Sequence, residues 1–241
     1  MKRVCIVFLF CLIPFSMMAA GGAKHKPEKT AEELAVEGQA FFEQKKYREA
    51  INTYERLRDW YPFSVHAKEA KLKVADAYYL LEEYDQAIAA YQTYYQLHPT
   101  DPQIPYVLYQ IGRCDFDRMV SIDRDQTPAA NALESFRSLI AQFPDSDYAA
   151  RAEDHIQDCL QNLAAKEHYI GKFYFKSKHY KAALHRFQSV IDDYPDFGLH
   201  AEAREFLERC KALIAASAGE EDAGEMELRP KEAEGGLVWP E

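Results

Sequence analysis

Two side chains that commonly bind metal ions, His155 and Cys159, stand four residues apart in a stretch with helical periodicity. This spacing puts an imidazole and a thiol on one face of a helix, and such a pair could supply half of a tetrahedral zinc site. No second pair of similar spacing stands nearby in the sequence. The pattern therefore favours an ordinary helix face over a metal site.

Sequence motifs of the common enzyme classes are absent from the chain. None of the patterns GxGxxG, GxxxxGK[ST], GxSxG and HExxH occurs, so no nucleotide-binding loop, nucleophilic serine or zinc-protease helix is indicated. We predict that the protein is not an enzyme and has no catalytic residues, no metal and no cofactor. Three cysteines, Cys114, Cys159 and Cys210, stand far apart among apolar neighbours. Their odd number and wide spacing favour small buried side chains over a disulfide or a redox role.

A repeated pattern of small and aromatic residues indicates which elements must position any site. Each copy holds a small residue, an aromatic residue three or four positions later, an alanine, another aromatic residue and a proline. The four copies run from Gly38 to Pro62, from Ala75 to Pro99, from Gly112 to Pro144 and from Gly171 to Pro195. This is the tetratricopeptide (TPR) pattern of paired helices. It predicts an all-α fold, a TPR-like α-solenoid of helical hairpins with about nine helices in four to five repeats.

Capping and spacing set the expected bounds of the repeats. Thr30 and Glu33 form a capping box at the start of the first helix. Repeats 1 and 2 are expected at residues 30–100, repeat 3 at 101–145, and repeats 4 and 5 at 146–216. Repeat 3 carries a polar insertion at residues 121–128, because 20 positions separate Gly112 from Ala132 where the other repeats have 12. Between residues 146 and 176 only Gly171 could break a helix, which predicts one long helix.

The two ends of the chain differ in composition from the repeats. Lys2 and Arg3 precede an apolar run and then small residues, which is typical of a secretory signal peptide at residues 1–20. A flexible linker is expected at 21–29 and an acidic, disordered tail at 217–241. The formal net charge of −10 argues against nucleic acid as a partner. We expect an exported protein.

The inner face of the predicted solenoid carries a stripe of aromatic residues. In a TPR stack the first helix of each pair lines the concave side, so the positions that flank its packing row face a groove. Counting from the small residues gives a peptide-binding groove of Phe42, Asp76, Tyr79, Tyr106, Tyr109, Arg113 and Phe116. Exposed rings beside a few charges suit an extended peptide, because apolar pockets give affinity and polar groups fix direction. The alternative is that the next helix covers this stripe.

Three loop strings resemble those of a known family. They are Trp60-Tyr61-Pro62-Phe63, the junction from His98 to Tyr109, and Ile122-Asp123-Arg124-Asp125. With the alanine-rich helix and the Phe143–Tyr148 turn that follow, they resemble the BamD family, the outer-membrane lipoproteins of the β-barrel assembly machinery. The likeness spans about residues 30–213. Such loop strings are more specific than TPR spacing.

The resemblance implies a non-catalytic scaffold at the periplasmic face of the outer membrane, held there directly or through a partner. It implies an N-terminal half that binds unfolded outer membrane proteins. It also implies a C-terminal half that docks the barrel-forming subunit BamA, with Arg186 at the position of the family's docking arginine. A guanidinium suits a partner carboxylate, and a solvated arginine is the alternative.

One departure from the family lies near the N-terminus. The family carries an acylated cysteine in a Leu-Ala-Gly-Cys-like string, whereas Cys11 here follows Phe8-Leu9-Phe10 and no cysteine directly follows Ala19. The pattern therefore leaves lipidation open. The alternative function is that of another periplasmic TPR adaptor, one that coordinates cell-envelope synthesis or division. That class usually carries an N-terminal coiled coil, and no heptad segment precedes residue 30.

Overall fold

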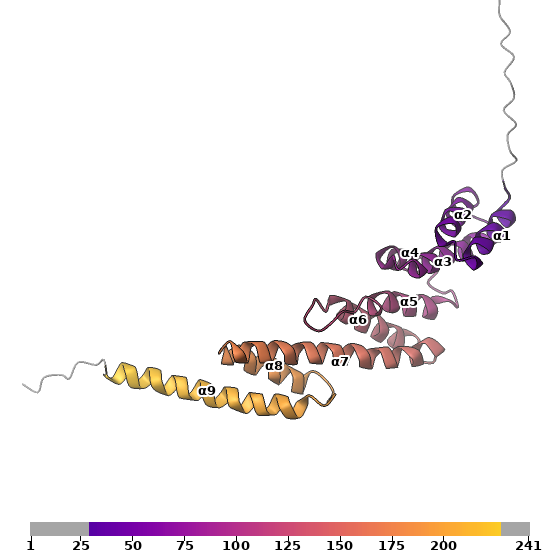
Figure 1. Cartoon of the computed structure of the whole chain (residues 1–241). Helices are drawn as coiled ribbons and strands as arrows, with labels where there is room; N and C mark the ends of the chain where they lie inside the picture. The colour runs from indigo at the N-terminus through magenta and orange to yellow at the C-terminus, as the bar shows by residue number, and fades with distance from the viewer. Residues whose placement is uncertain (1–28, 228–241) are drawn as a thin grey trace, which may run out of the picture.

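The computed structural model describes residues 29–227, and within this range the chain forms nine helices and no strand. The helices are α1 (Ala31–Glu43), α2 (Tyr47–Trp60), α3 (Val65–Leu80), α4 (Tyr84–Leu97), α5 (Ile104–Phe116), α6 (Thr127–Gln142), α7 (Asp147–Lys176), α8 (Tyr180–Asp192) and α9 (His200–Glu227). Each helix packs against the next one in the chain, and the hairpins stack into an elongated body with α1 and α9 at opposite ends (Figure 1). The predicted all-α, TPR-like solenoid is confirmed.

Side chains cap the first helix of several hairpins. The predicted capping box is present, because Glu33 N donates to Thr30 Oγ1 at 3.2 Å and Thr30 N donates to Glu33 Oε2 at 2.8 Å. Ser64 and Ser146 cap α3 and α7 in the same way, each accepting a bond from a backbone N–H of the first turn. These bonds satisfy amides that have no partner inside the helix.

The turn inside three of the hairpins has one recurring geometry. Lys45, Glu82 and Lys178 adopt left-handed φ angles of 59°, 59° and 62°. The next backbone N–H in each turn donates to a carbonyl five residues earlier, at 2.9 to 3.0 Å. This is the Schellman closure of a helix. It starts α2, α4 and α8 without a side-chain cap and fixes the angle of each hairpin.

The small residues of the repeat allow the paired helices to approach closely. A Cβ atom added to Gly38 would lie 2.7 Å from the Tyr54 ring, and one on Gly112 would lie 2.6 Å from the Phe136 ring. Gly171 faces Phe187 in the same manner, at 2.8 Å. Since atoms this close overlap, the aromatic side chain of the second helix occupies the space that the missing methyl group leaves.

Repeat 3 departs from its neighbours through a loop at residues 117–126. The predicted insertion at 121–128 overlaps this loop, but Thr127 and Pro128 already belong to the first turn of α6. The buried amide of Gln126 closes this loop, because its Nε2 donates to the carbonyls of Val120, Ser121 and Arg124 at 2.9 to 3.4 Å. Lys166 of α7 donates to the Arg124 carbonyl at 3.0 Å. The predicted long helix is confirmed, since α7 has 30 residues and therefore reaches both the loop and the groove side of α5.

The last helix is longer than the sequence predicts. A disordered tail is expected from residue 217, but α9 continues to Glu227. The alanines and glutamates of this segment have high helix propensity, so a helix started by packed residues continues through them. The expected signal peptide, the linker up to residue 28 and residues 228–241 lie outside the described range. No described helix has an apolar stretch long enough to cross a bilayer.

Candidate functional site

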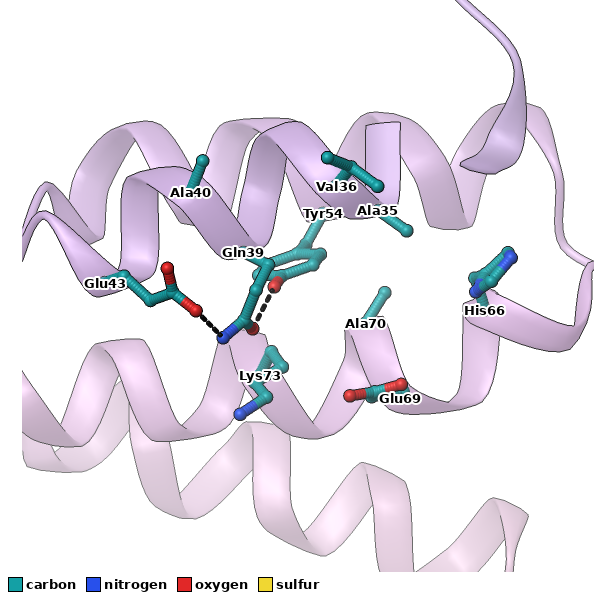
Figure 2. A pocket seen from close by; sticks show the side chains of 10 residues that line it. All are labelled: Ala35, Val36, Gln39, Ala40, Glu43, Tyr54, His66, Glu69, Ala70 and Lys73. Atoms are coloured by element: carbon teal, nitrogen blue, oxygen red, sulfur yellow. Dashed lines mark hydrogen bonds between the residues drawn. The ribbon is translucent and has the colours of Figure 1, made fainter. Parts of the chain in front are cut away.

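Two neighbouring cavities open on the side of the stack formed by α1, α3 and α5. The first has a volume of about 560 Å³ and lies between α1 and α3 (Figure 2). The second has a volume of about 450 Å³ and lies between α3 and α5, with Tyr148 of α7 at its edge. Both are lined by Glu69 and Lys73. These two residues form a wall that the cavities share, and we name the two cavities together the N-terminal groove.

Polar groups in the first cavity come from both walls. Tyr54 Oη donates to Gln39 Oε1 at 3.2 Å, and Gln39 Nε2 donates to Glu43 Oε1 at 2.9 Å (Figure 2). On the opposite wall the Lys73 ammonium lies 5.0 Å from the centre of the Phe42 ring and forms no ion pair with any described residue. Lys73 thus offers a free cation to a ligand in the groove.

A partly buried carboxylate organises the second cavity. Asp76 Oδ1 accepts bonds from Tyr91 Oη and Tyr106 Oη, both at 2.7 Å. Gln110 Nε2 donates to the same two phenol oxygens at 3.4 and 3.3 Å. Burial raises the pKa of Asp76 above its ordinary value, while the two phenols act in the opposite direction. The network fixes the Tyr106 ring at the wall of the groove.

The residue directly after each small residue of the repeat changes in polarity along the stack. In repeats 1 and 2 this residue is Gln39 or Asp76, and it accepts a bond from the tyrosine of the second helix. In the third and fourth repeats that aromatic residue is a phenylalanine without a hydroxyl, and the position is Arg113 or Lys172. These two cations pair instead with Asp117 and Glu202. Hydrogen-bond acceptors thus mark one half of the stack and cations the other.

The residues predicted for the groove divide into three groups. Asp76 and Tyr106 line the second cavity, and Phe42 lies against Lys73 of the first. The second group, Tyr79, Arg113 and Phe116, forms a separate cluster beside the groove. There Asp117 accepts bonds from the Tyr79 hydroxyl and from Arg113 Nη2, the latter at 3.0 and 3.1 Å, and the Arg113 guanidinium lies 6.0 Å from the centre of the Phe116 ring.

Tyr109 is a correction, because it does not face open space. Its side chain is only 3% exposed. The ring packs against Tyr148 and Phe136, with ring centres 5.5 and 5.8 Å apart, and Arg151 lies 4.8 Å from its centre. The hydroxyl forms a 3.0 Å hydrogen bond with His155 Nε2. The first turns of the long α7 cover this position, so the alternative of coverage by the next helix holds for Tyr109.

The two metal-binding residue types of α7 have different partners. His155 stacks on Phe136 with ring centres 5.3 Å apart and bonds to Tyr109, and burial lowers its pKa. Cys159 is fully buried, with its Sγ 3.8 Å from Met119 Sδ. Cys114 and Cys210 are also fully buried, as predicted. No group of three potential metal ligands occurs among the described residues.

Several groove residues are missing from the sequence prediction. Tyr94 and Tyr148 reach the second cavity from α4 and α7, and Lys68 is held there by Asp101 at 2.6 Å. His66 and Lys73 line the first cavity. Lys73 lies on the same face of α3 as Glu69 and Asp76. A prediction that took in more of this helical face would therefore have included Lys73. Tyr148 follows Asp76 by more than 70 residues, and no pattern in the sequence indicates that both line the second cavity.

Arg186, the predicted docking residue, lies on α8 and is partly exposed. Its Nη1 donates to both carboxylate oxygens of Glu167 on α7, at 2.8 and 3.1 Å. This bond raises the pKa of the guanidinium above its ordinary value. The guanidinium is therefore already paired within the chain, so any partner carboxylate must share or replace Glu167.

A family model described as "Outer membrane lipoprotein", named YfiO, matches residues 27–223. This chain belongs to the YfiO family. Its relatives include the outer membrane protein assembly factor BamD of Neisseria meningitidis serogroup A, which is 33% identical over 189 residues, 74% of this chain and 71% of the relative. BamD of Caulobacter vibrioides is 28% identical over 195 residues, 79% of this chain and 64% of the relative. The BamD resemblance seen in the loop strings is thereby confirmed.

The chain is also similar to solved repeat structures. One is the complex of the TPR2AB domain of yeast Sti1 with pHSP90, with a TM-score of 0.45 and 16% identity over 77% of this chain and 71% of that chain. The names of the sequence relatives describe an assembly factor and not an enzyme. Membership of the family therefore supports the prediction of a non-catalytic protein.

Proposed function

We propose that this protein is a non-catalytic scaffold of outer membrane β-barrel assembly that faces the periplasm. The N-terminal groove binds segments of unfolded outer membrane proteins, and the C-terminal hairpins dock the barrel-forming subunit. The names of the relatives support the assembly role. The observation that carries the binding role is that the two cavities lie side by side and share Glu69 and Lys73.

The groove has the chemistry that an extended peptide needs. Small apolar side chains, Ala35, Val36 and Ala70, line the first cavity, so a large side chain of the ligand can enter it. Fixed phenol rings line the second cavity. Lys73 between them can bind a carboxylate of the peptide, and Glu69 or Glu43 can accept its backbone amides. A peptide of a few residues therefore meets two apolar walls and a cation.

Peptide binding can be tested with a labelled peptide from the C-terminal end of an unfolded barrel protein. Charge reversal by Lys73→Glu should weaken its affinity by about fivefold or more, because a favourable contact is replaced by repulsion. Lys71→Glu is the matched control, because it makes the same charge change two residues away and lines neither cavity. Equal effects of the two variants would indicate long-range charge and would exclude the groove.

The C-terminal half offers a second surface with exposed rings. Tyr169 and Phe173 of α7 are 46% and 60% exposed. They line a cavity of about 440 Å³ together with Ile122 of the inserted loop, and Lys172 and Lys176 border it. Aromatic side chains with a basic rim suit a protein partner that carries acidic groups. This surface and Arg186 are the proposed contacts of the barrel-forming subunit.

Copurification of the barrel-forming subunit from native membranes tests the docking role of Arg186. Arg186→Glu should weaken it, whereas Glu167→Gln should leave it unchanged or strengthen it, because the arginine loses its internal competitor. If the ion pair is only structural, both variants break it and should act alike. Recovery of envelope-synthesis proteins in place of the barrel subunit would favour the alternative adaptor function.

A further inference from the structure

The turn between α2 and α3 exposes an unusual set of apolar side chains. Phe63 is fully exposed, Val65 is 86% exposed and Trp60 is 45% exposed. We name these three residues the first-turn patch. They occupy one short segment at the α1 end of the stack, so they form a local apolar projection instead of scattered surface residues.

The turn that carries the patch is held firmly. Tyr61 Oη donates to the Lys29 carbonyl at 2.9 Å, and Ser64 N donates to the Tyr61 carbonyl at 3.0 Å. Ser64 also caps α3. Since the backbone on both sides of Phe63 is bonded, the ring remains in water for a reason other than local disorder. The patch is a fixed feature of the surface.

Packing of the repeats does not require these apolar residues. The turns that end the other repeats have the same proline, but the residue after it is Thr100, Asp145 or Asp196. Thr100 and Asp145 stand in equivalent turns, because Asp101 N donates to the His98 carbonyl at 3.0 Å and Ser146 N to the Phe143 carbonyl at 3.2 Å, as Ser64 N does to Tyr61. The first turn therefore carries Phe63 in addition to what the fold needs, which indicates a contact outside the chain.

We propose that the first-turn patch contacts the lipid bilayer of the outer membrane. The bond from Tyr61 to Lys29 holds the patch beside the point where residues 1–28 join the structure. Eight residues separate the expected signal peptide from Lys29, and an extended chain of eight residues spans at most about 29 Å. Anything that attaches the N-terminal segment to a membrane therefore keeps the patch close to the bilayer.

The residue types of the patch suit a membrane interface. Tryptophan is enriched at the headgroup level, and cationic side chains beside it reach phosphate groups. The Arg56 guanidinium lies 4.6 Å from the centre of the Trp60 ring and forms no ion pair with any described residue. Phe63 and Val65 can enter the acyl boundary while Trp60 and Arg56 remain at the headgroups. The contact is mainly apolar, so the acidic charge of the chain does not prevent it.

Membership of a family of outer membrane lipoproteins makes the bilayer the favoured occupant over a second protein. A contact of three side chains gives only reversible binding, so the patch acts together with the attachment of the N-terminal segment. The groove is a separate surface of the chain. A failure of the lipid contact would therefore leave peptide binding at Lys73 unaffected.

Tryptophan fluorescence of the full chain tests the contact directly. The chain has two tryptophans, Trp60 and Trp239, so Trp239→Phe leaves Trp60 as the only reporter. On vesicles of phosphatidylethanolamine and phosphatidylglycerol, we expect its emission to shift to the blue and to be quenched by acyl chains brominated near the headgroup. Quenching by aqueous acrylamide should fall by about twofold or more, because the bilayer shields the ring.

The double substitution Phe63→Ser and Val65→Ser should abolish the quenching by brominated lipid and restore the acrylamide response. Both side chains are exposed, so folding is unaffected. Leu97→Ser, at another exposed residue that ends a helix, is the control and should change nothing. A chain that stays off the vesicles would overturn the inference. Equal access of acrylamide to Trp60 with and without vesicles, or shielding only after a protein partner is added, would overturn it as well.

Discussion

Truncation of Tyr109 separates folding from peptide binding. The side chain is 3% exposed and packs against Phe136, Tyr148 and His155. Loss of a buried aromatic ring of this size costs about 3–5 kcal/mol, because a cavity remains where the ring packed. Tyr109→Ala should therefore destabilise the chain by about that amount, and Tyr109→Phe by roughly 1–3 kcal/mol, because it leaves His155 Nε2 without its partner.

Urea denaturation followed by circular dichroism at 222 nm measures these losses, and the labelled peptide measures affinity at low temperature where the variants are folded. We expect the affinity of Tyr109→Phe to stay within about twofold of wild type, since the hydroxyl points to α7 and away from the groove. Tyr79→Ala is the control for stability. This ring is partly exposed, so its loss should lower the free energy of unfolding by less than the loss of Tyr109. A Tyr109→Ala chain with unchanged stability and weaker peptide binding would refute the burial argument. It would support the original prediction that Tyr109 lines the peptide-binding groove.

Three further predictions concern packing, pH and the inserted loop. Gly112→Ala should destabilise the chain by about 1 kcal/mol or more in urea denaturation, because overlap with Phe136 exceeds the gain in helix propensity. Burial lowers the pKa of His168 from its ordinary 6.5, so folding favours the neutral imidazole. This contribution to stability is present above pH 6.5 and is lost as the pH falls through the lower pKa of the folded state. The melting temperature of His168→Phe should therefore fall less than that of wild type between pH 7.5 and 5.5. Gln126→Ala should raise hydrogen exchange in residues 117–126 by roughly tenfold, since three carbonyls lose their donor.

Each of these predictions has a matched control. In a Phe136→Leu background, Gly112→Ala should become neutral or stabilising, and persistence of its full cost would contradict the overlap with the ring. His185→Phe replaces an exposed histidine, and an equal effect on the pH dependence would show that burial of His168 is irrelevant. Gln142→Ala removes an exposed amide and should leave exchange in the loop unchanged.

The sequence predicts the helical hairpins because their determinants are local. Thr30 and Glu33 cap a helix that lies next to them, and Gly38 and Tyr54 belong to one hairpin only 16 residues apart. Spacing within one repeat therefore contains most of the information about these contacts. The same spacing places Asp76 and Tyr106 on one face, and both line the second cavity.

The open or covered state of each groove position depends on contacts between distant repeats. Tyr109 and Tyr106 are three residues apart and look equivalent in the sequence, yet one is buried by Tyr148 and His155 of α7 and the other lines a cavity. The ion pair of Arg186 with Glu167 likewise joins two helices at a crossing. Local periodicity specifies which face of a helix points inward. Only the stacking of the long α7 over α5 determines how much of that face remains accessible, because coverage depends on the relative position of helices that no local pattern encodes.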